Sequence, residues 1–265
     1  MSVAAALVER AASASPLIVQ DAMSELADAD ELQFREEIER YPDPLVDIPR
    51  FIDGKELVRK LAFSLHEAGI SPAGEIVELG AGTCWLSAEL ARRPEVRRVR
   101  AVEFSERRIR SLAPVAIAHL GAQADKIERH VADFYAHGLE PGIADFVFTD
   151  AAFHHAADPA RLVRVAWDLL RPGGCLVLFR EPTIARLRRT RDHGEEGEHG
   201  DFEREYTSRE YLELLSDGGF LPERYTASGG WTTPRARAIL HPPLSWLNGT
   251  LFAEYTYVGR RPAIG

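Results

Sequence analysis

Short, largely apolar runs alternate with amphipathic segments from about residue 75 to the end of the chain. The short runs predict buried strands, and the segments with apolar residues every three or four positions predict helices that cover them. Because strands and helices alternate with short connections, the pattern predicts an α/β domain with a mostly parallel, doubly wound sheet. The expected strands are 75–79, 99–103, 127–132, 145–149, 175–179, 221–226 and 251–258.

The helices between these strands begin at recognisable signals. Asp158-Pro159 combines an N-capping carboxylate with a proline in the first turn. Thr207 and Glu210 have the spacing of a capping box. Pro114 is expected to kink the helix that contains it. The expected helices are 85–92, 105–120, 158–170 and 207–217.

The N-terminal part of the chain has no strand pattern, so we expect a helical cap over residues 1–70 and the main domain over residues 71–265. Residues 1–17 are rich in alanine but are interrupted by charges, which indicates a helix rather than a signal peptide. A second cap helix is expected to start at Asp53, because Glu56 follows with the spacing of a capping box. Its apolar stripe consists of Leu57, Leu61 and Leu65.

Three segments fall outside this rhythm. Residues 21–40 mix apolar and acidic positions and predict a partly exposed helix, which should end at the prolines that follow. Residues 183–206 are a candidate lid, and their His193 and His199 lie among glycines, which give metal ligands no rigid support. We therefore expect no metal. Residues 229–248 contain two tryptophans that either wall an acceptor pocket or pack an insertion onto the sheet.

Composition narrows the function classes. Of the 265 residues, 45% are hydrophobic, as in ordinary globular proteins, and the net charge of −9 disfavours binding to nucleic acid. The chain has no apolar run long enough to span a membrane. Its two cysteines, Cys84 and Cys175, form no CxxC pair, so we expect a reducing compartment and assign the protein to the cytoplasm. The sequence indicates no oligomeric state.

A glycine-rich turn joins the first strand to its helix and reads Glu78-Leu79-Gly80-Ala81-Gly82-Thr83-Cys84. Its glycines allow the backbone to approach a ligand closely. Glu103 ends the next strand, where a carboxylate can accept hydrogen bonds from both hydroxyls of a ribose. A dinucleotide fingerprint requires glycine at position 85, and Trp85 there would crowd a pyrophosphate. The pattern therefore favours S-adenosylmethionine (SAM) over NAD.

With these motifs, the chain from about residue 75 to residue 258 resembles the class I SAM-dependent methyltransferases, particularly those that act on small molecules. The resemblance implies a Rossmann-like fold with seven strands, the last of them antiparallel. It also implies a third glycine where Cys84 stands, so either a small residue is tolerated there or a reactive thiol lies beside the cofactor. The cofactor-binding residues that it implies are Glu78, Gly80, Ala81, Gly82, Glu103, Phe104, Asp133, Phe134 and Asp150.

His154 and His155 follow the fourth strand of the main domain and are the candidate catalytic residues. A histidine near neutrality can take a proton from a hydroxyl, phenol or amine acceptor. Methyl transfer can also proceed by positioning alone, so a dedicated base is not required. Glu181, after the fifth strand, either binds substrate or caps the next segment.

The expected function is transfer of a methyl group from SAM to a small-molecule acceptor, most often at oxygen. One alternative is a protein or RNA methyltransferase. Enzymes that methylate exocyclic or amide nitrogens often carry an Asp/Asn-Pro-Pro-aromatic run after the fourth strand, and the run Asp150-Ala151-Ala152-Phe153 lacks both prolines. A second alternative is a SAM-binding scaffold or a cyclase that uses the fold without transferring a methyl group.

Overall fold

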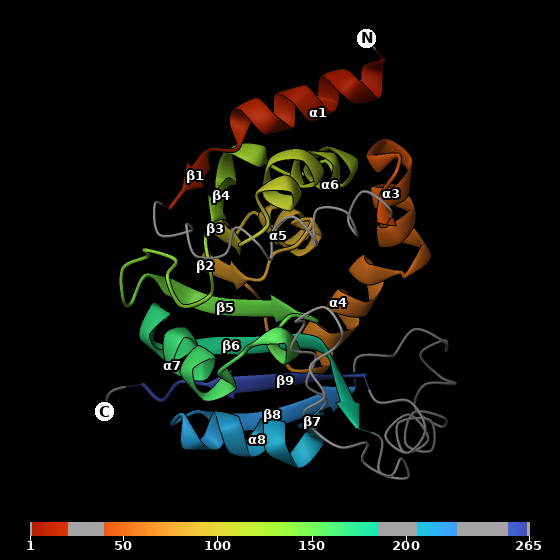
Figure 1. The fold of residues 1–265 in the computed structure, drawn as a ribbon. Helices are drawn as coiled ribbons and strands as arrows, with labels where there is room; N and C mark the ends of the chain where they lie inside the picture. The colour runs from red at the N-terminus through yellow and green to blue at the C-terminus, as the bar shows by residue number, and fades with distance from the viewer. Residues whose placement is uncertain (1, 21–39, 185–205, 227–253, 264–265) are drawn as a thin grey trace.

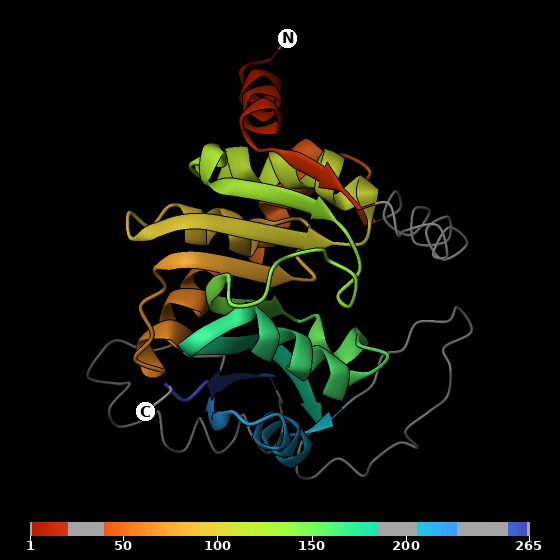
Figure 2. The same cartoon turned by 90° about the vertical axis from the view of Figure 1, so that its left-hand side faces the viewer.

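A computed structural model describes residues 2–20, 40–184, 206–226 and 254–263. Within them, nine strands form a mixed sheet in the order β1-β4-β3-β2-β5-β6-β9-β8, with β7 paired to the end of β6. Figure 2 shows the strands following one another from β1 at one end to β8 and β9 at the other. The strands are β1 (Leu17–Val19), β2 (Gly74–Leu79), β3 (Val96–Glu103), β4 (Ile127–Val131), β5 (Ala144–Asp150), β6 (Leu170–Ile184), β7 (Tyr206–Thr207), β8 (Leu221–Thr226) and β9 (Glu254–Arg260).

Helices cover both faces of this sheet (Figure 1). Successive residues of a strand point to opposite faces, so Ile76 joins the core beneath α5 and α6, whereas Val77 joins the core beneath α7 and α8. The helices are α1 (Val3–Ala14), α3 (Pro44–Gly54), α4 (Leu57–Glu67), α5 (Trp85–Ala91), α6 (Ala113–His119), α7 (Pro159–Leu169) and α8 (Ser208–Asp217), with short helices η2 (Arg108–Leu112), η3 (Ala124–Lys126) and η4 (Phe153–His155).

The doubly wound sheet predicted from the sequence is confirmed. Strands β4, β3, β2, β5 and β6 are parallel, and β9 runs antiparallel to both β6 and β8. The described residues form nine strands rather than the seven expected, and the additional ones are β1 and β7. Both are short, and β1 follows α1 so closely that its residues read as the end of that helix.

Two helix starts match their sequence signals. The Asp158 side chain accepts a hydrogen bond of 2.8 Å from the Arg161 N–H at the start of α7. Thr207 and Glu210 form a capping box at the start of α8. The helix expected over residues 105–120 is divided near Pro114, with η2 before it and α6 around it.

The expected helix start at Asp53 is wrong. Asp53 lies in the last turn of α3, and α4 starts only after Glu56, whose φ is 53°. The helix that contains Asp53 starts at Pro44 instead, where a proline in the first helical turn has no N–H that needs a partner. The predicted apolar stripe of α4 is buried and consists of Leu57, Leu61 and Leu65.

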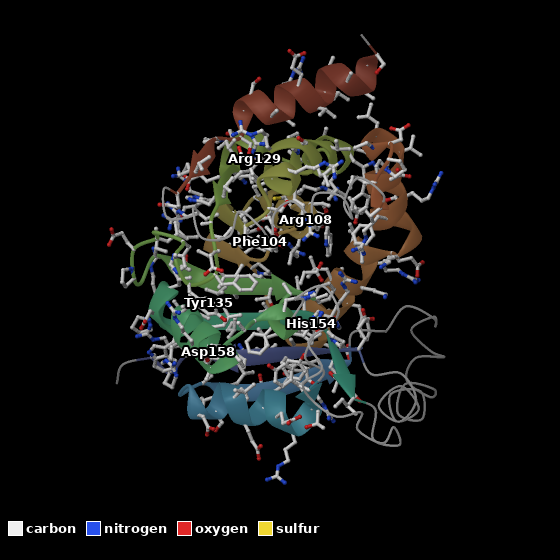
Figure 3. All side chains as sticks on the ribbon, viewed as in Figure 1. Phe104, Arg108, Arg129, Tyr135, His154 and Asp158 are labelled. Atoms are coloured by element: carbon white, nitrogen blue, oxygen red, sulfur yellow. The ribbon has the colours of Figure 1, made fainter. Side chains whose placement is uncertain are left out.

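A buried arginine ties the N-terminal segment to the sheet. Arg129 of β4 donates hydrogen bonds to the backbone carbonyls of Ala12 at 2.8 Å, Ser15 at 2.6 Å and Ile109 at 3.0 Å. Figure 3 labels it beside β4, near the end of α1. This contact fixes α1 and β1 at the β4 edge, whereas α4 packs against β9, where Ser64 and Thr256 form a hydrogen bond of 3.2 Å.

Several expected segments lie outside the described residues: the helix over residues 21–39, the candidate lid apart from its ends, and the insertion over residues 229–248. His193 and His199 belong to this group. Among the helices that the structure describes, none combines the length and the apolar character that crossing a membrane requires.

Candidate active site

The glycine-rich turn leaves β2 in a left-handed backbone conformation. Gly80 has a φ of 74° and Gly82 a φ of 52°, which glycine adopts without strain. Cys84 has a φ of 58°, which gives a physical reason for the glycine expected there. Its thiol is buried, and burial raises the pKa of Cys84 well above its ordinary value. The thiol therefore stays protonated near neutral pH, which favours the tolerated residue over the reactive thiol.

Glu103 faces this turn from the end of β3. One carboxylate oxygen accepts a hydrogen bond of 2.7 Å from the N–H of Gly82, and the other accepts one of 3.0 Å from the N–H of Ser105. Arg108 lies 3.8 Å away and adds positive charge beside the carboxylate. The acid is thus held against the turn, at the end of β3.

Glu78 lies beneath the turn rather than facing solvent. Its carboxyl group is buried and accepts a hydrogen bond from the hydroxyl of Ser87 in α5. Burial raises the pKa of Glu78 well above its ordinary value, and the nearby carboxylates of Asp150 and Glu103 raise it further. Three acidic side chains from β2, β3 and β5 therefore converge around the turn.

A buried ion pair closes the end of β5. Arg180 donates two hydrogen bonds to Asp150, of 2.7 and 2.8 Å, and the indole N–H of Trp85 donates one of 2.6 Å. Burial raises the pKa of Asp150, while Arg180 and Trp85 act in the opposite direction. Ala151, directly after β5, has a φ of 47°, and Arg180, within β6, has a φ of 53°, so both residues hold a strained backbone conformation.

Glu181 organises the turn that carries the two histidines. Its carboxylate is fully buried and accepts hydrogen bonds from the backbone N–H groups of Ala152, Phe153 and His154, at 3.0 to 3.3 Å. His154 Nδ1 donates a further hydrogen bond of 2.9 Å to the same carboxylate. Glu181 thus caps η4, which precedes it in sequence, whereas the sequence suggested a segment after it. His155 is exposed, with its ring centroid 4.1 Å from that of His154.

Aromatic side chains follow β3 and β4 near the same edge. Phe104 is partly buried, and the ring of Phe134 meets that of Tyr135 edge to face at 6.2 Å. Asp133 accepts a hydrogen bond of 2.7 Å from the N–H of Tyr135, which fixes this turn. In Figure 3, Phe104, Tyr135 and His154, which follow β3, β4 and β5, lie in the middle of the view.

Residues 77–178 match the model of a protein family described as a methyltransferase domain. The matched part contains the glycine-rich turn, Glu103, Asp150 and His154. Together with the fold, this match supports a class I SAM-dependent methyltransferase. SAM is accordingly the methyl donor of this enzyme.

Solved structures share the fold of this methyltransferase. A chain of the complex between the Haloferax volcanii Trm112 methyltransferase activator and a methyltransferase has 18% identity and a TM-score of 0.60, over 83% of this chain and 96% of that one. The SAM-dependent methyltransferase from Mesorhizobium loti has 21% identity and a TM-score of 0.51, over 74% and 95%. Geranyl diphosphate methyltransferase, in complex with GPP and sinefungin, has 18% identity and a TM-score of 0.52, over 76% and 76%. None of the curated proteins matches the sequence.

The residues around the turn of the methyltransferase fit SAM. A Cβ atom at Gly80 would lie 2.7 Å from the Cβ of Ala152 and 3.0 Å from Phe134, so only glycine, which has no side chain, fits at this position. The Thr83 hydroxyl is buried and has no hydrogen-bond partner within the described residues, which leaves it for a polar group of a ligand. When bound, SAM supplies a methyl group on a positively charged sulfur, and three acidic side chains surround the turn.

Sequence reasoning missed Arg180, although a signal was present. The apolar run of β6 ends directly at this arginine, and a cation next to a buried strand needs a carboxylate partner. The partner, Asp150, was singled out by the sequence only as a cofactor contact. Pairing the two requires knowing that β5 and β6 are neighbours in register, with Asp150 opposite Phe179.

Proposed function

We propose that this methyltransferase transfers the methyl group of SAM to an oxygen atom of a small organic acceptor, with His154 as the general base. The observation that carries the proposal is the hydrogen bond of 2.9 Å from His154 Nδ1 to the buried Glu181. A carboxylate only accepts hydrogen bonds, so Nδ1 carries a proton, and in the neutral imidazole the lone pair is then on Nε2. The His154 side chain is 12% exposed, so it is not sealed in the core.

An oxygen acceptor is the kind that gains most from such a base. A hydroxyl or phenol is a weak nucleophile while protonated, and its oxygen loses the proton when it is methylated. A positioned base contributes typically about 10²- to 10⁴-fold to such a step. The proton goes to His154 Nε2, and the adjacent Glu181 carboxylate stabilises the positive charge that forms on the ring. His155 is exposed, its ring is tilted by 38° to that of His154, and it receives no proton in this proposal.

The donor site in this proposal follows the elements of the sheet. The backbone of Gly80, Ala81 and Gly82 holds the methionine part, and Glu103 accepts hydrogen bonds from the ribose hydroxyls. Burial favours the protonated form of Glu78 and Arg180 pairs with Asp150, so Glu103 is the acid that adds negative charge next to the turn, where a positively charged sulfur is favoured. The adenine contacts are Phe104, Asp133 and Phe134.

Replacing Glu103 with alanine is expected to weaken SAM binding tenfold or more, which corresponds to about 1.4 kcal/mol. The reason is loss of the carboxylate that meets the ribose and holds the Gly82 N–H. Calorimetric titration with SAM measures the change. Glu106→Ala is the matched control, because Glu106 is an exposed acid that pairs with Arg110. Equal SAM affinities of the wild type and Glu103→Ala would show that Glu103 does not contribute to SAM binding.

A small acceptor is supported by the name of one similar protein, geranyl diphosphate methyltransferase, whose structure contains GPP. The proposal is tested by incubating the enzyme and SAM with phenols, alcohols, carboxylic acids and primary amines. S-adenosylhomocysteine release and the mass of each product are measured. We expect turnover with an oxygen acceptor. Turnover with amines alone would contradict oxygen methylation, and methylation of protein or RNA fractions alone would contradict a small acceptor.

A further inference from the structure

The connection between β4 and β5, residues 132–143, carries the two residues after β4 that the proposed function places at the adenine, Asp133 and Phe134. It contains no helix, and Figure 2 shows it as a green trace that leads from β4 to β5. The Phe134 ring lies against the glycine-rich turn, because a Cβ atom added at Gly80 would lie 3.0 Å from it. The position of this β4–β5 loop therefore determines the shape of the adenine end of the donor site.

Contacts with two other elements hold the β4–β5 loop. The hydroxyl of Tyr135 donates a hydrogen bond of 3.0 Å to the carbonyl of Asp158 and accepts one of 3.0 Å from its N–H, at the start of α7. Figure 3 labels both residues. Further along, the loop turns at Gly138, which has a φ of 67° and packs closely against the side chain of Gln20, directly after β1. The loop is thus fixed on both sides of residues 136 and 137.

His137 holds the turn of this loop through a hydrogen bond that requires a neutral ring. Its Nδ1 accepts a hydrogen bond of 3.0 Å from the N–H of Leu139. A backbone N–H only donates, so Nδ1 carries no proton in this arrangement, and the imidazole is neutral. The Leu139 side chain packs against the core beneath α7 and α8, so the bond joins the turn to the core. A proton on Nδ1 would break this bond.

The ionisable groups around His137 act in opposite directions. Burial lowers the pKa of His137, repulsion by His130 lowers it further, and Asp133 of the same loop raises it. His130 lies in β4 and is only 4% exposed. Burial and Arg100 lower the pKa of His130, whereas Glu128, 3.7 Å from its ring, raises it. His137 therefore takes up a proton only below the ordinary histidine pKa of about 6.5.

We propose that His137 is a positioning residue of the donor site that acts only in its neutral form, so that acidification releases the β4–β5 loop and weakens SAM binding. The inference rests on the proposed function, since it requires Phe134 and Asp133 to contact the adenine. When the pKa of His137 lies below its ordinary value, the neutral ring is present near pH 7.5 and is lost as the pH falls. The Kd for SAM should therefore rise on acidification.

The test is calorimetric titration with SAM near pH 7.5 and near pH 5, with circular dichroism to verify that each preparation is folded. SAM titrates equally in all experiments, so the ratio of the two Kd values is compared between variants. We expect the wild-type Kd to be roughly tenfold higher at the lower pH, since one pH unit below a pKa corresponds to about tenfold. In His137→Asn this additional rise should be absent.

His137→Asn should also keep the affinity near pH 7.5 within about twofold of the wild type, because an asparagine side chain can accept a hydrogen bond from the backbone two residues on. His137→Ala has no acceptor and should bind SAM about fivefold more weakly at both pH values. The matched control is His119→Asn, because His119 ends α6 and contacts Asp53, 3.1 Å away, outside the β4–β5 loop. It should keep the pH response of the wild type.

Three outcomes would overturn the proposal: no pH response in the wild type, the same response in the wild type and His137→Asn, or equal losses of affinity near pH 7.5 in His137→Asn and His137→Ala. Phe134→Ala, titrated near pH 7.5, tests the adenine contact separately. Unchanged SAM affinity of Phe134→Ala would contradict that contact of the proposed function and this proposal with it. Weakened affinity of Phe134→Ala, together with an unaltered pH response of His137→Asn, would contradict only the role of His137.

Discussion

Replacing His154 with glutamine is expected to lower kcat roughly 10²- to 10⁴-fold, while the Kd for SAM stays within about twofold of the wild-type value. The glutamine amide can still donate a hydrogen bond to Glu181, but it has no basic nitrogen to receive the proton of an acceptor. The loss should therefore appear in turnover rather than in donor binding. The measurement is the rate of S-adenosylhomocysteine formation with the best oxygen acceptor, together with a SAM titration of the same preparation.

The matched control is His155→Gln, because the two histidines are adjacent and His155 is exposed. Its kcat should stay within a few-fold of the wild-type value. A loss of equal size in both variants would indicate that the two adjacent rings act together, and a loss confined to His155→Gln would identify His155 as the base. If His154→Gln turns over like the wild type, transfer proceeds by positioning alone.

Glu181→Gln separates the positioning role of Glu181 from the base itself. In a neutral amide at this place, the oxygen can still accept hydrogen bonds from the turn, but the negative charge that stabilises a protonated His154 is lost. We expect kcat to fall while the Kd for SAM is unchanged. An unchanged kcat in a folded Glu181→Gln variant would show that Glu181 only caps η4 and does not assist His154.

Replacing Arg180 with methionine is expected to lower the free energy of unfolding by about 3–5 kcal/mol near pH 7, because it leaves a buried carboxylate without its partner. The Asp150 side chain is only 6% exposed, and both hydrogen bonds from Arg180 would be lost at once. Methionine keeps the unbranched stem against Trp85 and Phe179, so the change removes mainly the charge. Urea unfolding, followed by circular dichroism, measures the difference.

The penalty should depend on pH in a defined direction. Burial raises the pKa of Asp150 in the folded protein, and Arg180 opposes that rise. Without Arg180 the folded pKa rises further above its unfolded value, so the folded variant binds a proton that the unfolded chain releases. Stability of the variant then falls as pH rises through this window and recovers as pH falls below the raised pKa. The difference from the wild type should therefore shrink on acidification.

The double variant Arg180→Met/Asp150→Asn is the control for this explanation. It removes both charges, so it should be more stable than Arg180→Met alone near pH 7 and should lose the pH dependence of the penalty. A cost below about 1 kcal/mol for Arg180→Met, the range of exposed ion pairs, would show that water reaches Asp150 and solvates it.

The local rules of the sequence determined the order of the elements and predicted the donor end of the site. Apolar runs gave the central strands, Asp158 and Thr207 marked helix starts, and the turn from Glu78 to Cys84 with Glu103 predicted a nucleoside-binding edge. These features depend on residues close in sequence, or on the rule that parallel strands end at the same edge of the sheet. The failure at Asp53 is also local, because Asp53 belongs to the helix that starts at Pro44, and the helix with the predicted apolar stripe starts only after Glu56.

Only the tertiary structure decided which charged groups face one another. Arg180 reaches Asp150 across 30 positions, His154 reaches Glu181 across 27, and Lys60 reaches Glu254 across 194. Each pairing depends on strand register and on where the N-terminal helices pack, and the periodicity of the sequence carries neither. A buried charge requires a partner, but the sequence does not say which one. Local sequence patterns therefore predicted the methyl donor. The ion pairs near the site form only when β5, β6, β9 and α4 pack together.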